Sequence, residues 1–351
     1  MQFKAESDSG DAIFCWICPD NPSITPAIVI TAEGMEPREM APTSVLAHLV
    51  DIGAHNTGMV GFSITEKQFP GLARAKSLSI SERETGFCVY RRFEPARHIK
   101  QKLCFLLPGA MPQRGLLTEL GRHFAYNQNF IETNSNETIL NMIHHTGESV
   151  LLTGRINYGR YSDALRFMGF KMIALLRDPF EELAERLLFL RAIAGSASRD
   201  SLLKLARDLE PAIALAGRIQ FDDPKKLRAT MRGLSAEERG ALSNPLTAMF
   251  GCQMNERPER HHVTVALNNL AQYELVGVVE FFDDFKRILA DLLRADATRG
   301  VELRGMAITS VVARALAKTS SAVDLLDNDL ALYSYVEEAV ASGARAAIAE
   351  S

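Results

Sequence analysis

Two short runs of consecutive apolar residues constrain the fold of this chain more than any other feature of its sequence. The runs lie within Lys102–Leu107 and Lys171–Leu176, each stops at a turn that contains proline, and each is followed by a segment with helical spacing. Continuous apolar runs of this length are typical of strands buried on both faces of a parallel sheet. Ser149–Thr153 and Leu275–Val279 have the same character. We therefore predict an α/β fold, in which a parallel sheet is flanked by helices.

The ends of these strands are the expected place for a functional site. Pro108 and Gly109 follow the first run, and Arg177, Asp178 and Pro179 follow the second. In an open parallel sheet, ligands bind where strands give way to helices, because backbone N–H groups and the positive ends of helices point there.

The residues before the first run have a different pattern. Residues 1–98 are punctuated by Gly, Pro and Asn and predict a small β-rich accessory module with one helix between Thr43 and Asp51. Its strand candidates are Ala12–Cys18, Ala27–Ala32, Met59–Thr65, Leu78–Glu82 and Gly86–Arg92. A basic connector at Ala96–Lys102 leads into the α/β domain, which we place at residues 99–351. This domain includes a helical insert at about residues 194–250 and a helical C-terminal part.

Composition narrows the classes of protein to which the chain can belong. It has 351 residues, 47% of them hydrophobic, and a formal net charge of -4, so it can bury a large core and has no overall basic field that would recruit nucleic acid. No stretch of eighteen apolar residues occurs, which predicts no integral membrane segment. The first ten residues lack the pattern of a secretory signal, and we expect a cytoplasmic protein.

The cysteines and histidine pairs predict no metal site. Cys15 and Cys18 form a C-x-x-C pattern, but they lie in a strand candidate, where residues three apart face opposite sides. No second cysteine pair follows, and His261 and His262 have no further ligand at suitable spacing. Buried free thiols and a helix cap are the favoured interpretations.

Several short motifs follow one another in an order that resembles the carbohydrate sulfotransferases. The resemblance covers about residues 101–338 and is carried by Leu107–Gly109, Leu152–Gly159, Leu176–Pro179, Leu275–Asp284 and Leu326–Tyr333. It implies a P-loop-like sulfotransferase fold. It also implies transfer of a sulfuryl group, without a metal, from 3′-phosphoadenosine-5′-phosphosulfate to a saccharide hydroxyl, in the modification of a bacterial surface polysaccharide.

The resemblance also implies where the nucleotide and the reacting groups lie. The residues that it assigns to the nucleotide are Pro108, Gly109, Gln113, Arg114, Arg155, Arg177 and Glu185. For the base that activates the acceptor hydroxyl, the nearest candidates in the sequence are His144, His145 and Glu148.

Three departures from the family pattern leave a second hypothesis open. Gly109 stands where the family has a phosphate-binding lysine, Arg155 stands in place of a histidine, and Glu185 stands in place of a serine that contacts the 3′-phosphate. An acid at that place repels phosphate, or it pairs internally with Arg177, which lies eight residues earlier on the same helical face. The alternative is therefore a catalytically degenerate scaffold, an interaction or regulatory module that binds a saccharide, nucleotide or protein partner.

Overall fold

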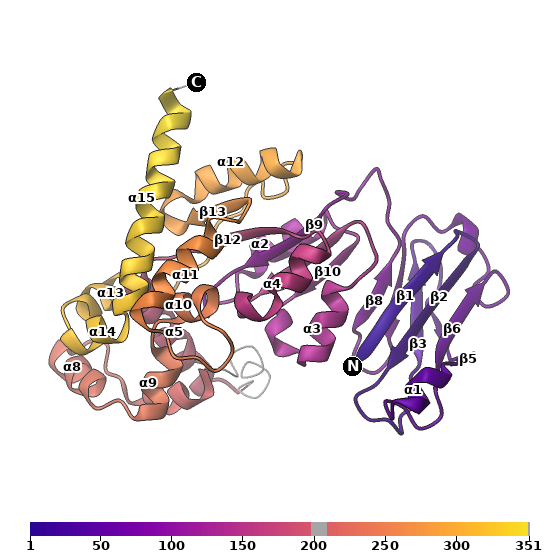
Figure 1. The fold of residues 1–351 in the computed structure, drawn as a ribbon, viewed down its shortest axis with the longest axis horizontal. Helices are drawn as coiled ribbons and strands as arrows, with labels where there is room; N and C mark the ends of the chain where they lie inside the picture. Colours follow the sequence, from indigo (N-terminus) through magenta and orange to yellow (C-terminus); the bar gives the residue numbers. More distant parts are fainter. Residues whose placement is uncertain (198–208, 350–351) are drawn as a thin grey trace.

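The first region of the chain is a sandwich of two antiparallel sheets. The computed structural model describes residues 1–197 and 209–349 (Figure 1). One sheet has the order β1 (Gln2–Asp8), β2 (Ala12–Cys18), β6 (Met59–Thr65) and β5 (Ser44–Val45). The other has the order β4 (Arg38–Met40), β3 (Ile28–Ala32), β7 (Leu78–Glu82) and β8 (Cys88–Arg91). Their buried side chains, among them Ile13, Phe62, Ile30 and Ile80, belong to one hydrophobic core.

All five predicted strands of this sandwich are present, and the predicted helix is shorter than expected. The bounds of β2, β6 and β7 coincide with the predicted ones. The expected helix at Thr43–Asp51 is wrong in its first part, because Ser44–Val45 pairs with β6 and the helix α1 spans only Ala47–Asp51. A one-turn 3₁₀ helix, η1, lies at Leu72–Arg74. The strand β1 was not predicted.

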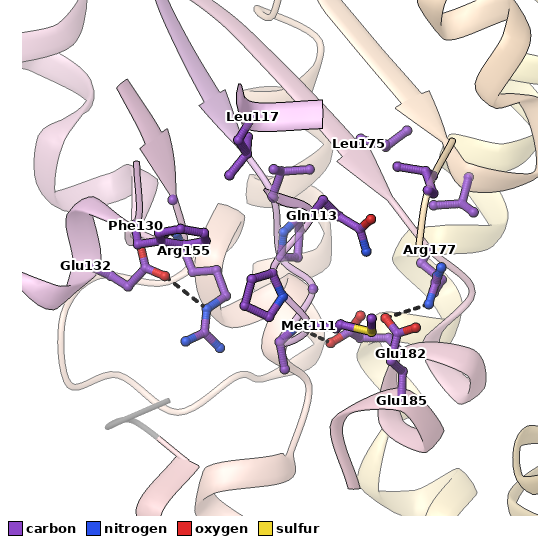
Figure 2. Close-up of a pocket in the computed structure, with 18 of the residues that line it drawn as sticks. Met111, Gln113, Leu117, Phe130, Glu132, Arg155, Leu175, Arg177, Glu182 and Glu185 are labelled. Atoms are coloured by element: carbon purple, nitrogen blue, oxygen red, sulfur yellow. Dashed lines mark hydrogen bonds and ion pairs between the residues drawn. The ribbon is translucent and has the colours of Figure 1, made fainter. Parts of the chain in front are cut away.

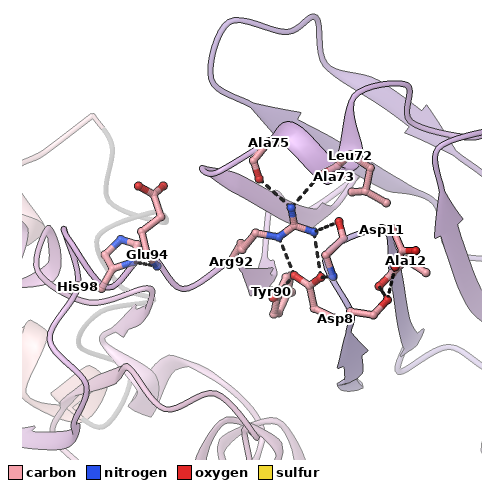
Figure 3. Close-up of polar contacts among 12 residues, drawn as sticks. Asp8, Asp11, Ala12, Leu72, Ala73, Ala75, Tyr90, Arg92, Glu94 and His98 are labelled. Atoms are coloured by element: carbon pink, nitrogen blue, oxygen red, sulfur yellow. Dashed lines mark hydrogen bonds and ion pairs between the residues drawn. The ribbon is translucent and has the colours of Figure 1, made fainter.

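One arginine joins distant parts of the sandwich. The Arg92 guanidinium donates to both carboxylate oxygens of Asp8, from Nε at 2.7 Å and Nη2 at 2.9 Å (Figure 3). Its remaining N–H groups donate to the carbonyl oxygens of Leu72, Ala75 and Gly10 at 2.7 to 3.0 Å. Asp8 also accepts from the Tyr90 hydroxyl at 2.7 Å. We call this cluster the Arg92 clamp.

The second region is built on a five-stranded parallel sheet flanked by helices, which confirms the predicted α/β architecture. The strands lie in the order β10 (Tyr126–Asn129), β11 (Val150–Gly154), β9 (Lys102–Leu106), β12 (Lys171–Leu176) and β13 (Leu275–Val278). Every neighbouring pair is parallel. This architecture is compatible with Rossmann-like and P-loop-like folds.

Helices cover both faces of this sheet, because alternate residues of its strands point to opposite sides. Leu103 and Phe105 of β9 pack with one group of helices, and Cys104 and Leu106 belong to the core on the other face. The first face carries α2 (Arg114–Gly121) and α12 (Phe282–Leu293). The second face carries α3 (Asn136–Ile143), α4 (Tyr158–Phe167), α10 (Pro245–Gly251), α11 (Arg260–Leu270) and α15 (Asp327–Ala349).

The remaining helices form a separate core beside the sheet. They are α5 (Pro179–Ala194), α7 (Ile213–Arg218), α8 (Pro224–Arg232), α9 (Ala236–Leu242), α13 (Thr309–Ala317) and α14 (Ser320–Leu325). The predicted insert at 194–250 is mainly helical where it is described, with short turns between its helices, and its residues 198–208 lie outside the described residues. The 3₁₀ turns η2 (Ile131–Thr133) and η4 (Val279–Phe281) follow β10 and β13.

Two helices begin side by side and cap each other. The Asp329 carboxylate accepts from the N–H groups of Leu246 and Thr247 at the start of α10, at 2.9 and 2.7 Å. In return, the Asn244 side-chain oxygen accepts from the N–H groups of Asn328 and Asp329 at the start of α15, at 3.0 and 3.1 Å. Asn244 has a φ of 46°. Complete burial raises the pKa of Asp329 to about 6, although these hydrogen bonds oppose the shift.

The two regions touch, but they share no sheet in the described part of the chain. The Gln128 amide of β10 donates to the Cys88 carbonyl oxygen of β8 at 2.9 Å, and the Thr146 hydroxyl donates to the Ala5 carbonyl oxygen at 2.9 Å. Among the described residues, no helix is both long and apolar enough to cross a membrane.

Candidate functional site

A pocket lies at the carboxyl ends of the parallel strands, where the sequence predicts a site. Segments that follow or end all five strands line it, and six of the predicted nucleotide residues are among them (Figure 2). Those six are Pro108, Gly109, Gln113, Arg155, Arg177 and Glu185. The cavity volume is about 50 Å³. This corresponds to room for roughly three to five water-sized groups, because one buried water needs about 10–15 Å³ on the same measure.

The predicted pairing of Arg177 with Glu185 is present. Arg177 Nη1 lies 2.6 Å from Glu185 Oε2, and the side chains are 13% and 2% exposed (Figure 2). Burial raises the pKa of the Glu185 carboxyl above its ordinary value, although Arg177 lies against it. The other oxygen of that carboxylate, Oε1, is buried and has no hydrogen-bond partner among the described residues.

A second acid, Glu182, contacts the loop after β9, whose backbone N–H groups an anionic ligand would need. Its Oε1 accepts from the Ala110 N–H at 3.1 Å and lies 3.2 Å from Arg186 Nη2. A Cβ built on Gly109 would lie 3.4 Å from the other oxygen of Glu182. The loop that resembles a phosphate loop therefore already contacts a carboxylate of the protein.

The helix that follows the second turn is also capped from within. Asp178 accepts from the N–H groups of Phe180 and Glu181 at 2.9 Å each, and Pro179 has no N–H to offer. The positive end of α5 is thus matched by a side-chain carboxylate. Burial raises the pKa of Asp178.

On the other side of the pocket, Arg155 pairs with Glu132. The Arg155 Nε lies 3.3 Å from one carboxylate oxygen of Glu132, and its backbone N–H donates to the other at 3.0 Å. Gly154 permits this approach, since a Cβ there would lie 2.9 Å from the Ile131 backbone nitrogen. Each arginine that lines the pocket therefore has a glutamate against it.

The remaining predicted nucleotide residues have other surroundings. The Gln113 side chain is bound at both ends to the Arg304 backbone, at 2.9 and 2.8 Å. Arg114 begins α2, is exposed and does not line the pocket, so its predicted contact with a nucleotide is not supported by its position.

The three residues proposed as bases lie near the amino-terminal end of β11, whereas the pocket lies at the carboxyl ends of the strands. His144, His145 and Glu148 precede β11, whereas the pocket lies at its last residue and beyond. The strand has five residues, so its length of roughly 16 Å separates these side chains from the pocket. His144 caps α3, and Glu148 is exposed and pairs with Lys100 at 3.0 Å. For a reaction in this pocket, their prediction as bases is wrong.

His145 instead belongs to the packing behind β10. Its ring stacks on Tyr126 with centroids 4.0 Å apart, and it is 5% exposed. Burial and the nearby Lys102 lower its pKa to about 4, so the ring is neutral near neutral pH.

Sequence reasoning missed two of the three acids that line the pocket, Glu182 and Glu132. Glu182 and Arg186 stand four residues apart on α5, a spacing that allows an ion pair and could have been recognised. Glu132 and Arg155 are 23 residues apart and meet only because β10 and β11 are neighbours.

Comparison with known proteins adds no family. No protein-family model and no curated protein matches this sequence. Within the described residues, no group of three or more His, Cys, Asp or Glu side chains is placed to hold a metal ion.

Proposed function

We propose that this protein is a catalytically degenerate, sulfotransferase-like scaffold that binds a neutral, hydroxyl-rich ligand, a saccharide, in the strand-end pocket and does not transfer a sulfuryl group. The observation that carries this proposal is the buried pair of Arg177 and Glu185. Arg177 is the cation on which a nucleotide phosphate would depend, and an acid of the same chain already occupies it.

The charge balance of the pocket supports the same conclusion. Two arginines and three glutamates line it, so it offers no excess positive charge. A nucleotide that carries two phosphates would meet Glu182 and Glu185 across a short distance, and like charges in a partly buried site repel strongly.

A saccharide hydroxyl suits what the pocket does offer. Glu185 lines the pocket, and its Oε1 has no partner among the described residues. That oxygen is closed to solvent, so a rotation of the carboxylate toward the cavity precedes donation by a hydroxyl. Ligand pockets commonly have volumes of roughly 300–1,000 Å³, so a cavity of about 50 Å³ admits one edge of a sugar rather than a whole nucleotide.

The second candidate function is sulfuryl transfer to a bacterial surface saccharide. It is favoured by the convergence of six predicted nucleotide residues, from loops far apart in the sequence, on one pocket. It requires a base that the histidines behind β10 do not supply.

Calorimetry with 3′-phosphoadenosine-5′-phosphate separates the two candidates. We expect no binding by the natural protein at about 1 mM ligand, and Glu185→Ser to lose stability without gaining affinity. Sulfuryl transfer predicts instead that the nucleotide binds, that Arg177→Ala weakens it roughly ten- to a hundredfold, and that Glu185→Ser tightens it. Arg114→Ala, outside the pocket, is the matched control.

Saccharide binding needs its own measurement. Saturation-transfer NMR with a panel of neutral mono- and disaccharides should show contact with the natural protein and a weaker signal with Glu185→Gln. If no saccharide of the panel gives a signal, the ligand class is wrong.

A further inference from the structure

A groove at the far edge of the parallel sheet is separate from the strand-end pocket. It is lined by α11, β13, α12 and α15, and its volume is about 470 Å³. The strand β13 ends the sheet, next to α12 and α15 (Figure 1). Two of the large apolar side chains that line the groove are well exposed, Ile288 of α12 at 41% and Tyr335 of α15 at 57%.

The backbone of β13 presents unpaired groups to this groove. The Glu274 N–H donates to the Met172 carbonyl oxygen of β12 at 3.0 Å. Because backbone direction alternates along a strand, Val276 also faces β12, and the N–H and C=O groups of Leu275 and Gly277 face the open edge. No strand of the described chain pairs with that edge. An edge of this kind is a template for one more strand.

The walls of the groove indicate what such a strand would carry. A strand beside β13 would point its side chains alternately toward α12 and α15, and both walls offer apolar contacts, from Ile288 on one side and Val336 and Val340 on the other. The charged residues that line the groove are Glu274 and Asp284, without a lysine or arginine among them. Glu274 Oε2 accepts from the Met172 N–H at 2.6 Å, and Asp284 lies 3.3 Å from the exposed Arg287, so each acid keeps one carboxylate oxygen for a cation of the partner.

From this geometry we propose that the open edge of β13 binds an extended segment of a partner protein, which adds to the sheet as a sixth strand. The segment has apolar residues along its length and a lysine or arginine that meets Glu274 or Asp284. A second copy of this chain fits less well, because it would bring the same two acids to the groove and like charges repel.

A labelled heptapeptide, acetyl-Lys-Val-Thr-Val-Thr-Val-Lys-amide, tests the proposal by fluorescence polarisation. We expect saturable binding to the full chain below about 1 mM. The same peptide N-methylated at its valines and threonines has no N–H donors at these residues, on either edge of the strand that it would form. Its binding should weaken at least about tenfold. This comparison uses the natural protein throughout, so it does not depend on the folding of a variant.

A protein variant locates the binding. Ile288→Lys places a cation in the groove wall and should weaken peptide binding at least about tenfold, whereas Val311→Lys, on an exposed site of α13, should leave it unchanged. The proposal is overturned if the peptide does not bind, or if neither N-methylation nor Ile288→Lys affects binding. It is also overturned if sedimentation shows a dimer that Ile288→Lys abolishes, which would assign the groove to a second copy.

Discussion

Two partly buried arginines of this protein, Arg92 in the sandwich and Arg177 in the strand-end pocket, are each paired with a carboxylate. The two pairs differ in how many of their polar atoms have hydrogen-bond partners. Arg92 uses all five of its N–H groups, and Asp8 accepts from Tyr90 and Gly10 as well. Arg177 meets Glu185 at 2.6 Å, and that acid keeps one buried oxygen without a partner among the described residues.

This difference separates a structural ion pair from a candidate binding site. Removing charges from water costs free energy, and a complete set of hydrogen bonds offsets most of it. The Arg92 clamp has that complete set and therefore holds the sandwich together. The pair in the pocket leaves acceptor capacity unused in a cavity, where a ligand can complete it.

The largest expected effect is at the Arg92 clamp. Arg92→Met leaves the partly buried Asp8 without its main partner and should lower the free energy of unfolding by about 2–4 kcal/mol. Urea unfolding followed by circular dichroism measures this. Arg83→Met is the control, because the ion pair of Arg83 with Glu84 is exposed and should matter little. Equal losses in both variants would mean that the clamp has no special role.

Breaking the pair in the pocket should cost less. Glu185→Gln removes the counter-charge of Arg177, but burial already disfavours the Glu185 carboxylate, so we expect the free energy of unfolding near neutral pH to change by less than about 1 kcal/mol. The double variant Arg177→Met with Glu185→Leu removes both charges and should be at least as stable as Glu185→Gln. A double variant less stable than Glu185→Gln would argue that the pair is itself stabilising.

The two acids should respond to pH with opposite signs. Burial alone would raise the pKa of Asp8, but hydrogen bonds from Arg92 and Tyr90 outweigh burial and lower this pKa below 3.8. The stabilisation that Asp8 contributes is therefore present above that pH and lost as the pH falls below it. Burial raises the pKa of Glu185 above 4.5, so its contribution is present below that pH and lost as the pH rises.

Unfolding curves between about pH 3 and pH 7 test these signs. The difference in free energy of unfolding between the natural protein and Asp8→Asn should shrink toward acid pH. The free energy of unfolding of the natural protein should rise relative to that of Glu185→Gln as the pH falls. Slopes of the same sign would show that the two sites do not differ as described.

The smallest effects are expected at one glycine in each site. Gly10, beside Asp8, has a φ of 92°, and Gly10→Ala should cost about 1 kcal/mol because an alanine is strained there. Gly109→Ala places a Cβ 3.4 Å from Glu182, an ordinary contact, and should change stability by less than about 0.5 kcal/mol. Thermal unfolding of both variants under one condition is sufficient. A larger loss at Gly109 would show that the loop of the pocket is as tightly constrained as the clamp.

The sequence predicted the sheet better than the site, and the reason is physical. The strands β9, β11, β12 and β13 are nearly continuous apolar runs, which few other structures explain. The strand β10 reads Tyr-Asn-Gln-Asn and escaped prediction, because it lies at the edge of the sheet and its polar side chains bind neighbours such as Thr153 and Gly121.

The sequence located the site residues that directly follow a strand, because the end of the strand fixes their position. It missed the residues that reach the pocket only through contacts between distant segments. Arg177 and Arg155 follow strands directly, and the sequence located both. The position of His145 close to β11 in the sequence was misleading, because closeness to a strand does not say at which of its two ends a residue lies.

The mutual capping of α10 and α15 has a consequence for how the chain folds as it is synthesised. Asn244 and Asp329 are 85 residues apart, so the start of α10 waits for its capping carboxylate until the ribosome has made most of the second region. At roughly 5–20 residues per second, this wait lasts about 4 to 17 seconds. During that interval the N–H groups of Leu246 and Thr247 have only water as an alternative partner to Asp329, and α10 should be among the last helices of the sheet's second face to become protected from hydrogen exchange.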